Sequence, residues 1–238
     1  MFFPSLAGRR CEPEVMDQPS LDPRDHVQAL RGLARINRLS ASDRILWSRI
    51  AGVARDCSDR PLRVLDVASG GGDVAIRLWR RAQRANLRME IFGADASMTA
   101  VEHAQTNAQS AGAAVEFFQL DVVRSELPEG FDVITSSLFL HHLHEEHAVA
   151  LLRKMGQAAR RMMLINDLLR CRTGHLLAWF GGRLLSRSPV VHADAPASVA
   201  AAFTMDEARL LAEKAGLPSA TFEWRWPWRF LLAWSKLP

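Results

Sequence analysis

The pattern of hydrophobic and polar positions changes at about residue 62. Residues 25–56 place apolar side chains three and four positions apart, which is typical of amphipathic helices. Beyond that point short apolar runs alternate with amphipathic stretches, of which 97–111 and 144–158 are clear helices. The apolar runs predict five strands, over residues 62–68, 89–95, 114–121, 131–137 and 161–167.

Strands that alternate with helices predict βαβ units and a parallel sheet, here an α/β, doubly wound one with helices on both faces. Ligands of such folds bind at the carboxyl ends of the strands. The C-terminal region breaks the alternation, because 220–236 holds two β-like runs around Pro227 with no helix between them. These runs predict an antiparallel hairpin, which brings the mostly parallel sheet to seven strands. Thr204 to Glu207 form a capping box that opens a helix before the hairpin.

The same pattern suggests how the chain is divided. Residues 1–24, rich in Pro, Asp and Glu, are expected to be a tail, and 25–58 to be helices that cover the ligand site. Residues 59–238 form the main domain. An insertion over about 168–203 follows the fifth strand, with an amphipathic helix and then a loop. At the strand ends this insertion would act as a substrate-selecting cap.

Composition narrows the class of protein. The chain has 238 residues and 48% hydrophobic residues, enough for one domain with a sizeable core. Its net charge is +4, and nearly all of its positive charge comes from arginines that are scattered along the chain. We therefore expect a solvated surface and no nucleic-acid partner.

Cysteine usage and apolar runs bear on the compartment. Three cysteines stand far apart with no metal-ligand spacing, which favours free thiols in a reducing compartment. The start of the chain lacks an apolar core of signal-peptide length. The longest apolar stretch, 176–185, contains Arg183 and is too short to span a bilayer. We expect a cytoplasmic protein without an integral membrane part; no oligomeric state is predicted.

The first strand leads into a turn with three consecutive glycines, Gly70 to Gly72, followed by a helix. Backbone amides at a helix N-terminus favour anions or carboxylates, and glycine lets a ligand approach the backbone closely. Alone, such a turn fits a nicotinamide-cofactor fingerprint, a phosphate loop or a plain tight turn. The sequence contains no G-x-x-x-x-G-K-[ST] run, which excludes a nucleoside-triphosphate loop of that type.

Three acidic residues at strand ends indicate which kind of ligand the turn would bind. Asp66 lies inside the first strand, two residues before the turn, where it would repel a pyrophosphate and favour an amine-bearing ligand. Asp95 ends the second strand, where a carboxylate can accept from both hydroxyls of a ribose. Asp121 ends the third strand, placed to accept from an adenine amine. Together they predict an adenosine joined to an ammonium group.

With these motifs the chain resembles the class I S-adenosylmethionine-dependent methyltransferases, which have a Rossmann-like fold. Their acid-x-Gly-x-Gly-x-Gly motif corresponds to residues 66–72, with Ala68 at the first glycine position. The resemblance extends over about residues 60–236. It implies a methyltransferase (EC 2.1.1 class) whose cofactor is S-adenosyl-L-methionine (SAM).

The resemblance also implies the residues that contact the cofactor, which lie in the glycine turn and after strands two, three and four. They are Asp66, Ala68, Ser69, Gly70, Gly72, Asp95, Ala96, Met98, Asp121, Val122, Ser137 and Leu138. N-terminal helices in this superfamily fold over the carboxylate end of the cofactor, so Arg35 or Arg38 could bind there. The alternative is that both arginines lie on the surface.

A narrower likeness concerns three segments, residues 14–42, 165–170 and 190–204. They resemble a bacterial subgroup found among methyltransferases of polyketides and aromatic metabolites. This likeness implies a small phenolic or quinone-like acceptor, and the apolar cap agrees with an apolar or aromatic molecule.

Methyl transfer to a phenol benefits from a general base. The candidates are His141 and His142 after the fourth strand, Asp167 at the end of the fifth, and His192 in the cap. A capping or structural role remains the alternative for the histidine pair. We expect no metal site, because residues 141–147 start a helix and point in several directions.

Several functions remain after these arguments. O-methylation of a small aromatic acceptor is favoured, and C-methylation of a quinone-type ring is the alternative. A catalytically silent protein that binds S-adenosylhomocysteine (SAH) is a third possibility. The position of Asp66 disfavours a nicotinamide oxidoreductase. Residues 136–139 lack the proline pair typical of nucleic-acid amino-methyltransferases, which disfavours that class.

Overall fold

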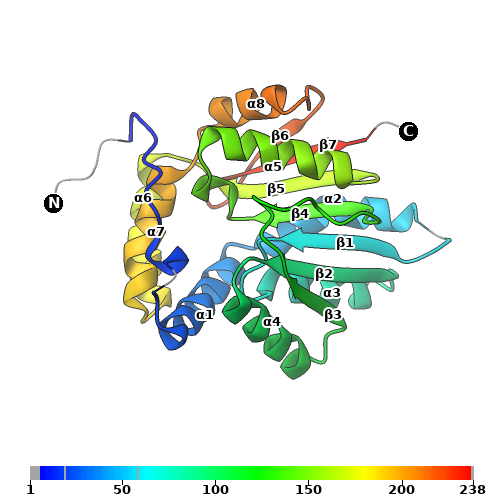
Figure 1. The fold of residues 1–238 in the computed structure, drawn as a ribbon, viewed down its shortest axis with the longest axis horizontal. Helices are drawn as coiled ribbons and strands as arrows, with labels where there is room; N and C mark the ends of the chain where they lie inside the picture. The colour runs from blue at the N-terminus through cyan, green and yellow to red at the C-terminus, as the bar shows by residue number, and fades with distance from the viewer. Residues whose placement is uncertain (1–5, 19, 58, 237–238) are drawn as a thin grey trace.

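A central sheet organises the computed structural model, which describes residues 6–18, 20–57 and 59–236. Seven strands in these residues pair in the order β3-β2-β1-β4-β5-β7-β6, and only β7 runs antiparallel to its neighbours (Figure 1). The strands are β1 (Leu62–Val67), β2 (Met89–Asp95), β3 (Val115–Gln119), β4 (Val133–Ser137), β5 (Met162–Leu168), β6 (Thr221–Arg225) and β7 (Arg229–Ser235). The predicted doubly wound sheet and its C-terminal hairpin are confirmed.

Helices cover both faces of this sheet and its carboxyl edge. They are α1 (Pro23–Leu39), α2 (Ser42–Arg55), α3 (Asp73–Arg84), α4 (Met98–Ala111), α5 (Glu145–Ala158), α6 (Arg172–Leu185), α7 (Pro189–Ala201) and α8 (Met205–Lys214). Two short 3-10 helices, η1 (Val15–Asp17) and η2 (Leu140–His142), lie at the carboxyl edge. The capping box at the start of α8 forms as predicted.

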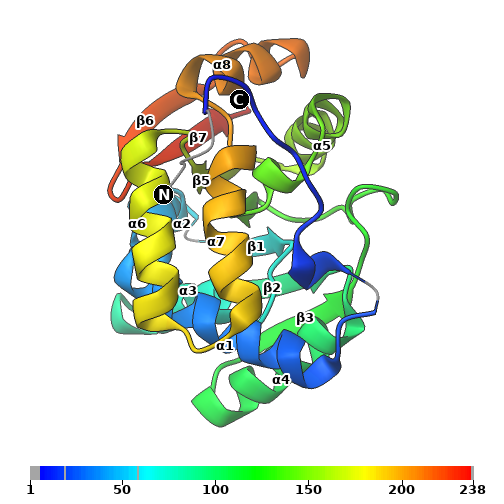
Figure 2. The same ribbon diagram turned by 90° about the vertical axis from the view of Figure 1, so that its left-hand side faces the viewer.

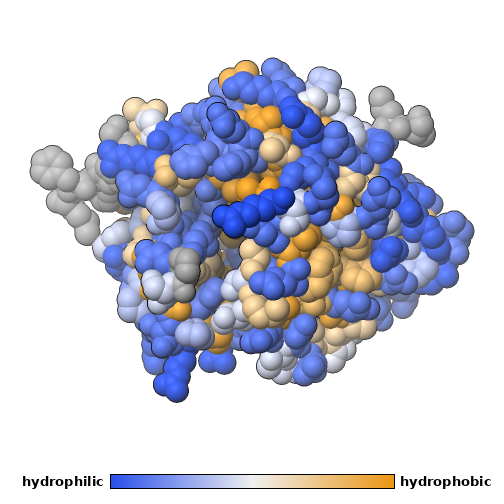
Figure 3. Space-filling view, in the orientation of Figure 1, coloured by the Kyte–Doolittle hydropathy of each residue, from blue (hydrophilic) through white to orange (hydrophobic). Residues whose placement is uncertain are grey.

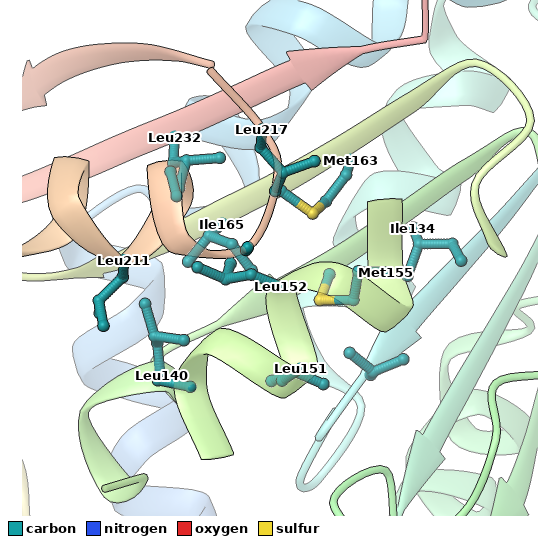
Figure 4. Packing of buried hydrophobic residues seen from close by; sticks show 14 of the residues in the cluster. Ile134, Leu140, Leu151, Leu152, Met155, Met163, Ile165, Leu211, Leu217 and Leu232 are labelled. Atoms are coloured by element: carbon teal, nitrogen blue, oxygen red, sulfur yellow. The ribbon is translucent and has the colours of Figure 1, made fainter. Parts of the chain in front are cut away.

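Apolar side chains form one core on each face of the sheet. Helices α5 and α8 pack against one face, where Leu151 and Leu211 meet Ile165 and Leu232 (Figure 4). Helices α2, α3 and α4 pack against the other. Each fully buried leucine of these cores contributes about 1.5–3 kcal/mol of transfer free energy. Because both faces are covered, the central strands read as nearly continuous apolar runs, and this made them predictable.

The N-terminal residues 6–18, which we call the strap, pack on the molecule where the sequence predicts a tail. The strap runs past α7 to the start of α1 (Figure 2). The guanidinium group of Arg9 donates to the backbone carbonyls of Ala201, His141 and Leu143. The carboxylate of Asp194 accepts the backbone N–H groups of Val15 and Met16, 2.9 and 3.0 Å away. These contacts close the carboxyl edge of the sheet.

The cap after β5 is a pair of helices. Helix α6 was predicted, but the segment interpreted as a loop forms most of α7. Pro189 occupies the first turn of α7, where its fixed φ and missing N–H are tolerated, and alanines supply high helix propensity. His192 is therefore a helical residue.

Hydrophilic side chains dominate the face shown in Figure 3, with smaller apolar areas between them. In the described ranges, no helix combines the length and the apolar character that crossing a membrane requires.

Substitution of Gly72 would test how tightly the turn after β1 packs. Gly72 has a φ of +73°, and a Cβ there would lie 2.5 Å from the Phe117 ring. Gly112 has a φ of +59° and no atom within 4 Å of such a Cβ. We expect Gly112→Ala to lower the free energy of unfolding by about 1–2 kcal/mol through backbone strain alone. Gly72→Ala should cost about 1–3 kcal/mol more through overpacking. Urea unfolding measures both, and equal losses would contradict this packing.

Candidate functional site

A cavity of about 760 Å³ opens at the carboxyl ends of the central strands. The strap, α1 and α7 contribute to its walls, together with the turns that follow β1 to β4. Its position is the one expected for a ligand in an open α/β sheet.

The glycine turn after β1 forms one wall of the cavity. Ala68 and Gly70 adopt positive φ angles of 54° and 51°. Glycine takes this conformation without strain, whereas the alanine is held in it by its surroundings. The backbone N–H of Gly70 donates to Oδ2 of Asp95 over 2.8 Å, which joins the turn to the end of β2. The backbone of the turn is thus exposed to a ligand and fixed in place.

The three predicted acids line this one cavity, Asp66 from β1, Asp95 from β2 and Asp121 from the end of β3. Asp95 accepts one backbone N–H on each oxygen, from Gly70 and Ser97. Asp121 accepts the N–H groups of its own turn and lies 3.6 Å from the guanidinium of Arg124. Both oxygens of Asp95 and the Oδ2 atom of Asp121 keep acceptor capacity for a ligand.

Asp66 is the most deeply placed of the three, with 2% of its surface exposed. Burial raises the pKa of its carboxyl group to about 7, and the hydrogen bond from Thr135 opposes the shift only in part. Burial likewise raises the pKa of Asp95, against its two backbone hydrogen bonds. Burial therefore disfavours the ionised forms of Asp66 and Asp95, and a cationic ligand beside them would stabilise these forms.

Most of the other predicted cofactor residues also reach the cavity. Those that line it are Ala68, Ser69, Gly70, Ala96, Val122, Ser137 and Leu138. Gly72 and Met98 do not line it, because Gly72 packs on Phe117 and Met98 is half exposed at the start of α4. Arg35 does not either, since its guanidinium donates to the carbonyl of Leu185 on the exposed side of α1. The geometry thus gives no support for a cofactor contact by Arg35.

The histidine pair after β4 lines the same cavity, in η2. Nδ1 of His141 lies 2.6 Å from Oδ1 of Asp167, whose other oxygen accepts the backbone N–H of His141. Nδ1 of His142 lies 2.7 Å from Oδ2 of Asp17. The two Nε2 atoms both face Glu14 of the strap. Two of the predicted base candidates, His141 and Asp167, are therefore brought together.

This group of side chains is strongly coupled. Burial lowers the pKa of His141, but Asp167 and Glu14 outweigh it and raise that pKa to about 10. Burial raises the pKa of Glu14, and the two histidines outweigh it and lower that pKa to about 2. The pKa of Asp167 is lowered in the same way, since His141 more than compensates for burial. The group therefore holds positive charge between its carboxylates.

His192, the fourth base candidate, lies elsewhere. Its Nε2 atom pairs with the carbonyl of Ser186 over 2.7 Å, and it does not line the cavity. A structural role in α7 explains this contact.

Several cavity residues were not singled out from the sequence. Glu14 and Ser198 line the cavity but lie in segments whose sequence shows no periodicity that marks them as ligands. Arg229, at the start of β7, is 2% exposed and lines the cavity; its Nη1 donates to Ser42, while its buried Nε has no hydrogen-bond partner. Burial lowers the pKa of Arg229 to about 10. An anionic ligand would satisfy this free N–H.

The central part of the chain is similar in sequence to known methyltransferases. A family model described as a methyltransferase domain matches residues 64–161. The demethylmenaquinone methyltransferase of Thermus thermophilus is 34% identical over 101 residues, which are 42% of this chain and 44% of that protein. The chain thus spans less than half the length of the curated relatives that it matches.

Solved structures resemble the chain over a longer range. The magnesium protoporphyrin IX methyltransferase from Synechocystis PCC 6803 with bound SAH has a TM-score of 0.58 at 19% identity, covering 84% of this chain and 85% of that one. An O-methyltransferase family 2 protein from Planctomyces limnophilus in complex with apigenin has a TM-score of 0.56 at 17% identity, covering 83% and 62%. Residues 64–161 thus match the methyltransferase-domain model, and the chain shares the fold of solved SAM-dependent methyltransferases.

Proposed function

We propose that the chain is a SAM-dependent methyltransferase (EC 2.1.1 class) that methylates an oxygen of a small aromatic or polyketide-like acceptor. The observation that carries this proposal is the distribution of polar groups along one cavity. Three carboxylates lie at the ends of β1 to β3, and the histidine pair lies beyond β4, on the other side of β1 in the strand order. Apolar side chains of α1, Leu30, Leu33 and Ile36, line the same space.

The carboxylate side fits SAM. Asp95 has an acceptor site left on each oxygen for the two ribose hydroxyls, and Asp121 lies one strand further, where an adenine amine would donate. Asp66 faces the position of the ammonium group. A Cβ at Gly70 would have only Leu30 within 4 Å, so a ligand has room against this backbone.

Arg229 is assigned to the carboxylate of the methionine part, in place of Arg35. Its buried guanidinium has an unpartnered Nε and faces the cavity near Asp73 and Asp167. A carboxylate would satisfy that N–H and offset the cost of burying the charge. Asp66 and Arg229 would then hold the two charged ends of one amino acid.

The reaction requires the protein to align the acceptor with the methyl group and does not require a covalent intermediate with the protein. SAM supplies a methyl group that its sulfonium already activates. The chain's own residues orient the acceptor oxygen on that methyl group, and the strap, α1 and α7 exclude water; such positioning can contribute about 7–11 kcal/mol. The acceptor hydroxyl must lose its proton as the C–O bond forms. Glu14, His141 and His142 are the polar groups on that side of the cavity.

A second candidate is C-methylation of a quinone-type ring. The similarity to a demethylmenaquinone methyltransferase over 101 residues favours it. The two functions share the cofactor and differ in the acceptor atom. The product therefore separates them: an O-methyl ether in one case, a C-methylated ring in the other.

Cofactor binding is tested first, by titrating SAH in a calorimeter. We expect micromolar binding to the wild type and a loss of at least about 100-fold in Asp95→Ala, because two hydrogen bonds to a charged group contribute about 1.5–3 kcal/mol each. Asp206→Ala, which removes an exposed carboxylate of α8, is the matched control and should bind normally.

Methyl transfer is then measured with isotope-labelled SAM and a panel of phenols, naphthols and naphthoquinols. Formation of a methyl ether supports the proposal, and a methylated ring carbon supports the second candidate. SAH binding without transfer to any acceptor would favour a catalytically silent SAH-binding protein. Absence of SAH binding would contradict the proposed function as a whole.

The raised pKa of Asp66 predicts a pH dependence. The neutral acid, which dominates below the folded pKa of about 7, cannot pair with an ammonium group, so SAH binding should weaken about tenfold per pH unit below that value. Asp73 and Asp95, the nearby acids, add to the raised pKa. Binding measured between pH 5.5 and 7.5 should show this slope in the wild type and a flat, weaker profile in Asp66→Asn. Equal slopes would contradict the role of Asp66.

The assignment of Arg229 is tested with two ligands. We expect Arg229→Gln to weaken SAH binding about 10- to 100-fold, the effect of one charged hydrogen bond. Binding of 5′-methylthioadenosine, which has no carboxylate, should change little. Arg35→Gln is the matched control. Loss of SAH affinity in Arg35→Gln alone would restore the assignment made from the sequence.

A further inference from the structure

Three ligating side chains converge on one point of the cavity wall. Nε2 of His141 lies 3.6 Å from Oε1 of Glu14, and Nε2 of His142 lies 3.7 Å from Oε2 of the same carboxylate. One ligand atom from each residue fits within 4.8 Å of the other two. The glutamate comes from the strap and the histidines from η2, so the tertiary fold alone brings them together.

The hydrogen bonds on the far side of each ring decide which way the lone pairs point. Asp167 and Asp17 lie 2.6 and 2.7 Å from the Nδ1 atoms of His141 and His142. A carboxylate accepts only, so each Nδ1 carries a hydrogen, and each ring presents its Nε2 atom to Glu14. Each Nε2 either carries a proton that Glu14 accepts or, once that proton is displaced, offers its lone pair to a metal ion.

The separations leave room for a metal ion in that position. An N–H···O hydrogen bond spans 2.7–3.2 Å, and both contacts with Glu14 are longer. Ligand atoms about 2.0–2.1 Å from a shared tetrahedral ion lie roughly 3.3 Å apart. One atom from each residue lies within 4.8 Å of the other two, so a small inward shift of the side chains completes the site. Carboxylates behind both histidines are also the usual outer shell of a metal site.

The surroundings hold these ligands in place. Glu14 is 7% exposed, and Ser198 of α7 donates a hydrogen bond to it. Asp194 fixes the strap through the two backbone N–H groups that follow Glu14. The guanidinium of Arg9 donates to the backbone carbonyls of His141 and Leu143 and so holds η2 in place. The site is therefore preorganised.

We propose that Glu14, His141 and His142 bind a divalent transition-metal ion of the zinc type. Two imidazoles and one carboxylate suit zinc better than magnesium or calcium, which prefer oxygen ligands. Three protein ligands leave a fourth position open, as in catalytic zinc sites, and all three residues line the cavity.

The role of the ion rests on the proposed function. An acceptor hydroxyl in the open position would lose its proton to solvent, because the ion lowers its pKa. The resulting oxygen anion forms the C–O bond as the S–C bond of SAM breaks, and SAH leaves as a neutral thioether. His141 then acts as a ligand, while Asp167 and Asp17 are positioning residues.

The test uses the whole chain, freed of metal with a chelator and titrated with Co²⁺, whose visible absorption reports its ligands. We expect one ion per chain, displaced by Zn²⁺. Asp17→Asn should weaken binding about 10- to 100-fold through the outer shell, and Glu14→Gln and His142→Ala by more than that. His147→Ala, an exposed histidine of α5, is the matched control and should bind normally.

SAH titration of each variant separates the possible failures. A wild type that binds SAH but no Co²⁺ or Zn²⁺ at micromolar concentration would overturn the metal site and leave the cofactor proposal standing. So would metal binding that Glu14→Gln and His142→Ala leave unchanged while both bind SAH, which also shows that they fold. Stoichiometric metal binding without SAH binding would support the site and remove the proposed methyl transfer.

Discussion

The candidate site depends on one buried contact, between Asp167 at the end of β5 and His141 after β4. Asp167 accepts both the backbone N–H of His141 and, through its other oxygen, the hydrogen on Nδ1. These bonds fix the direction of the ring and tie η2 to the sheet. Nε2 of His141 then faces Glu14, which seats the strap against α7 and closes the cavity. Without this contact, the buried carboxylate of Asp167 would keep only the backbone N–H of Leu168, and the buried imidazole only its longer contact with Glu14, which is strongly unfavourable.

The positions of the acids on the other side of the cavity are set by the parallel strands of the sheet. Parallel strands end at the same edge, so acids at the ends of β1, β2 and β3 necessarily meet. Their positions could be predicted from the sequence because buried strands and the glycine turn leave strong local signals. Strand register places Asp66 and Asp95 there, and Asp121 follows in the turn just after β3.

The strap and the cap could not be predicted in the same way. Glu14 lies in a segment without apolar periodicity, and its partners are more than a hundred residues away in the sequence. Helix α7 contains an internal proline and was interpreted as a loop, although Pro189 and the alanines favour a helix. Arg35 shows a different limit, because helical periodicity gives the face of a side chain but not which carbonyl its end group reaches. Arg229 lies among tryptophans in a strand, where no pattern marks it as a ligand.

Charge connects the two sides of the cavity. Burial makes the carboxylate side favour a cation, and positive charge also lies beside Glu14, on the histidines or on an ion that they bind. An ion at Glu14 would stabilise an acceptor that has lost its proton. The negative charge of a phenolate is shared between its oxygen and ring carbons, so the same ion would assist O-methylation and C-methylation alike. It follows that the cluster does not choose between the two products. The choice falls to the apolar walls of α1 and the cap, which decide whether the oxygen or a ring carbon faces the methyl group.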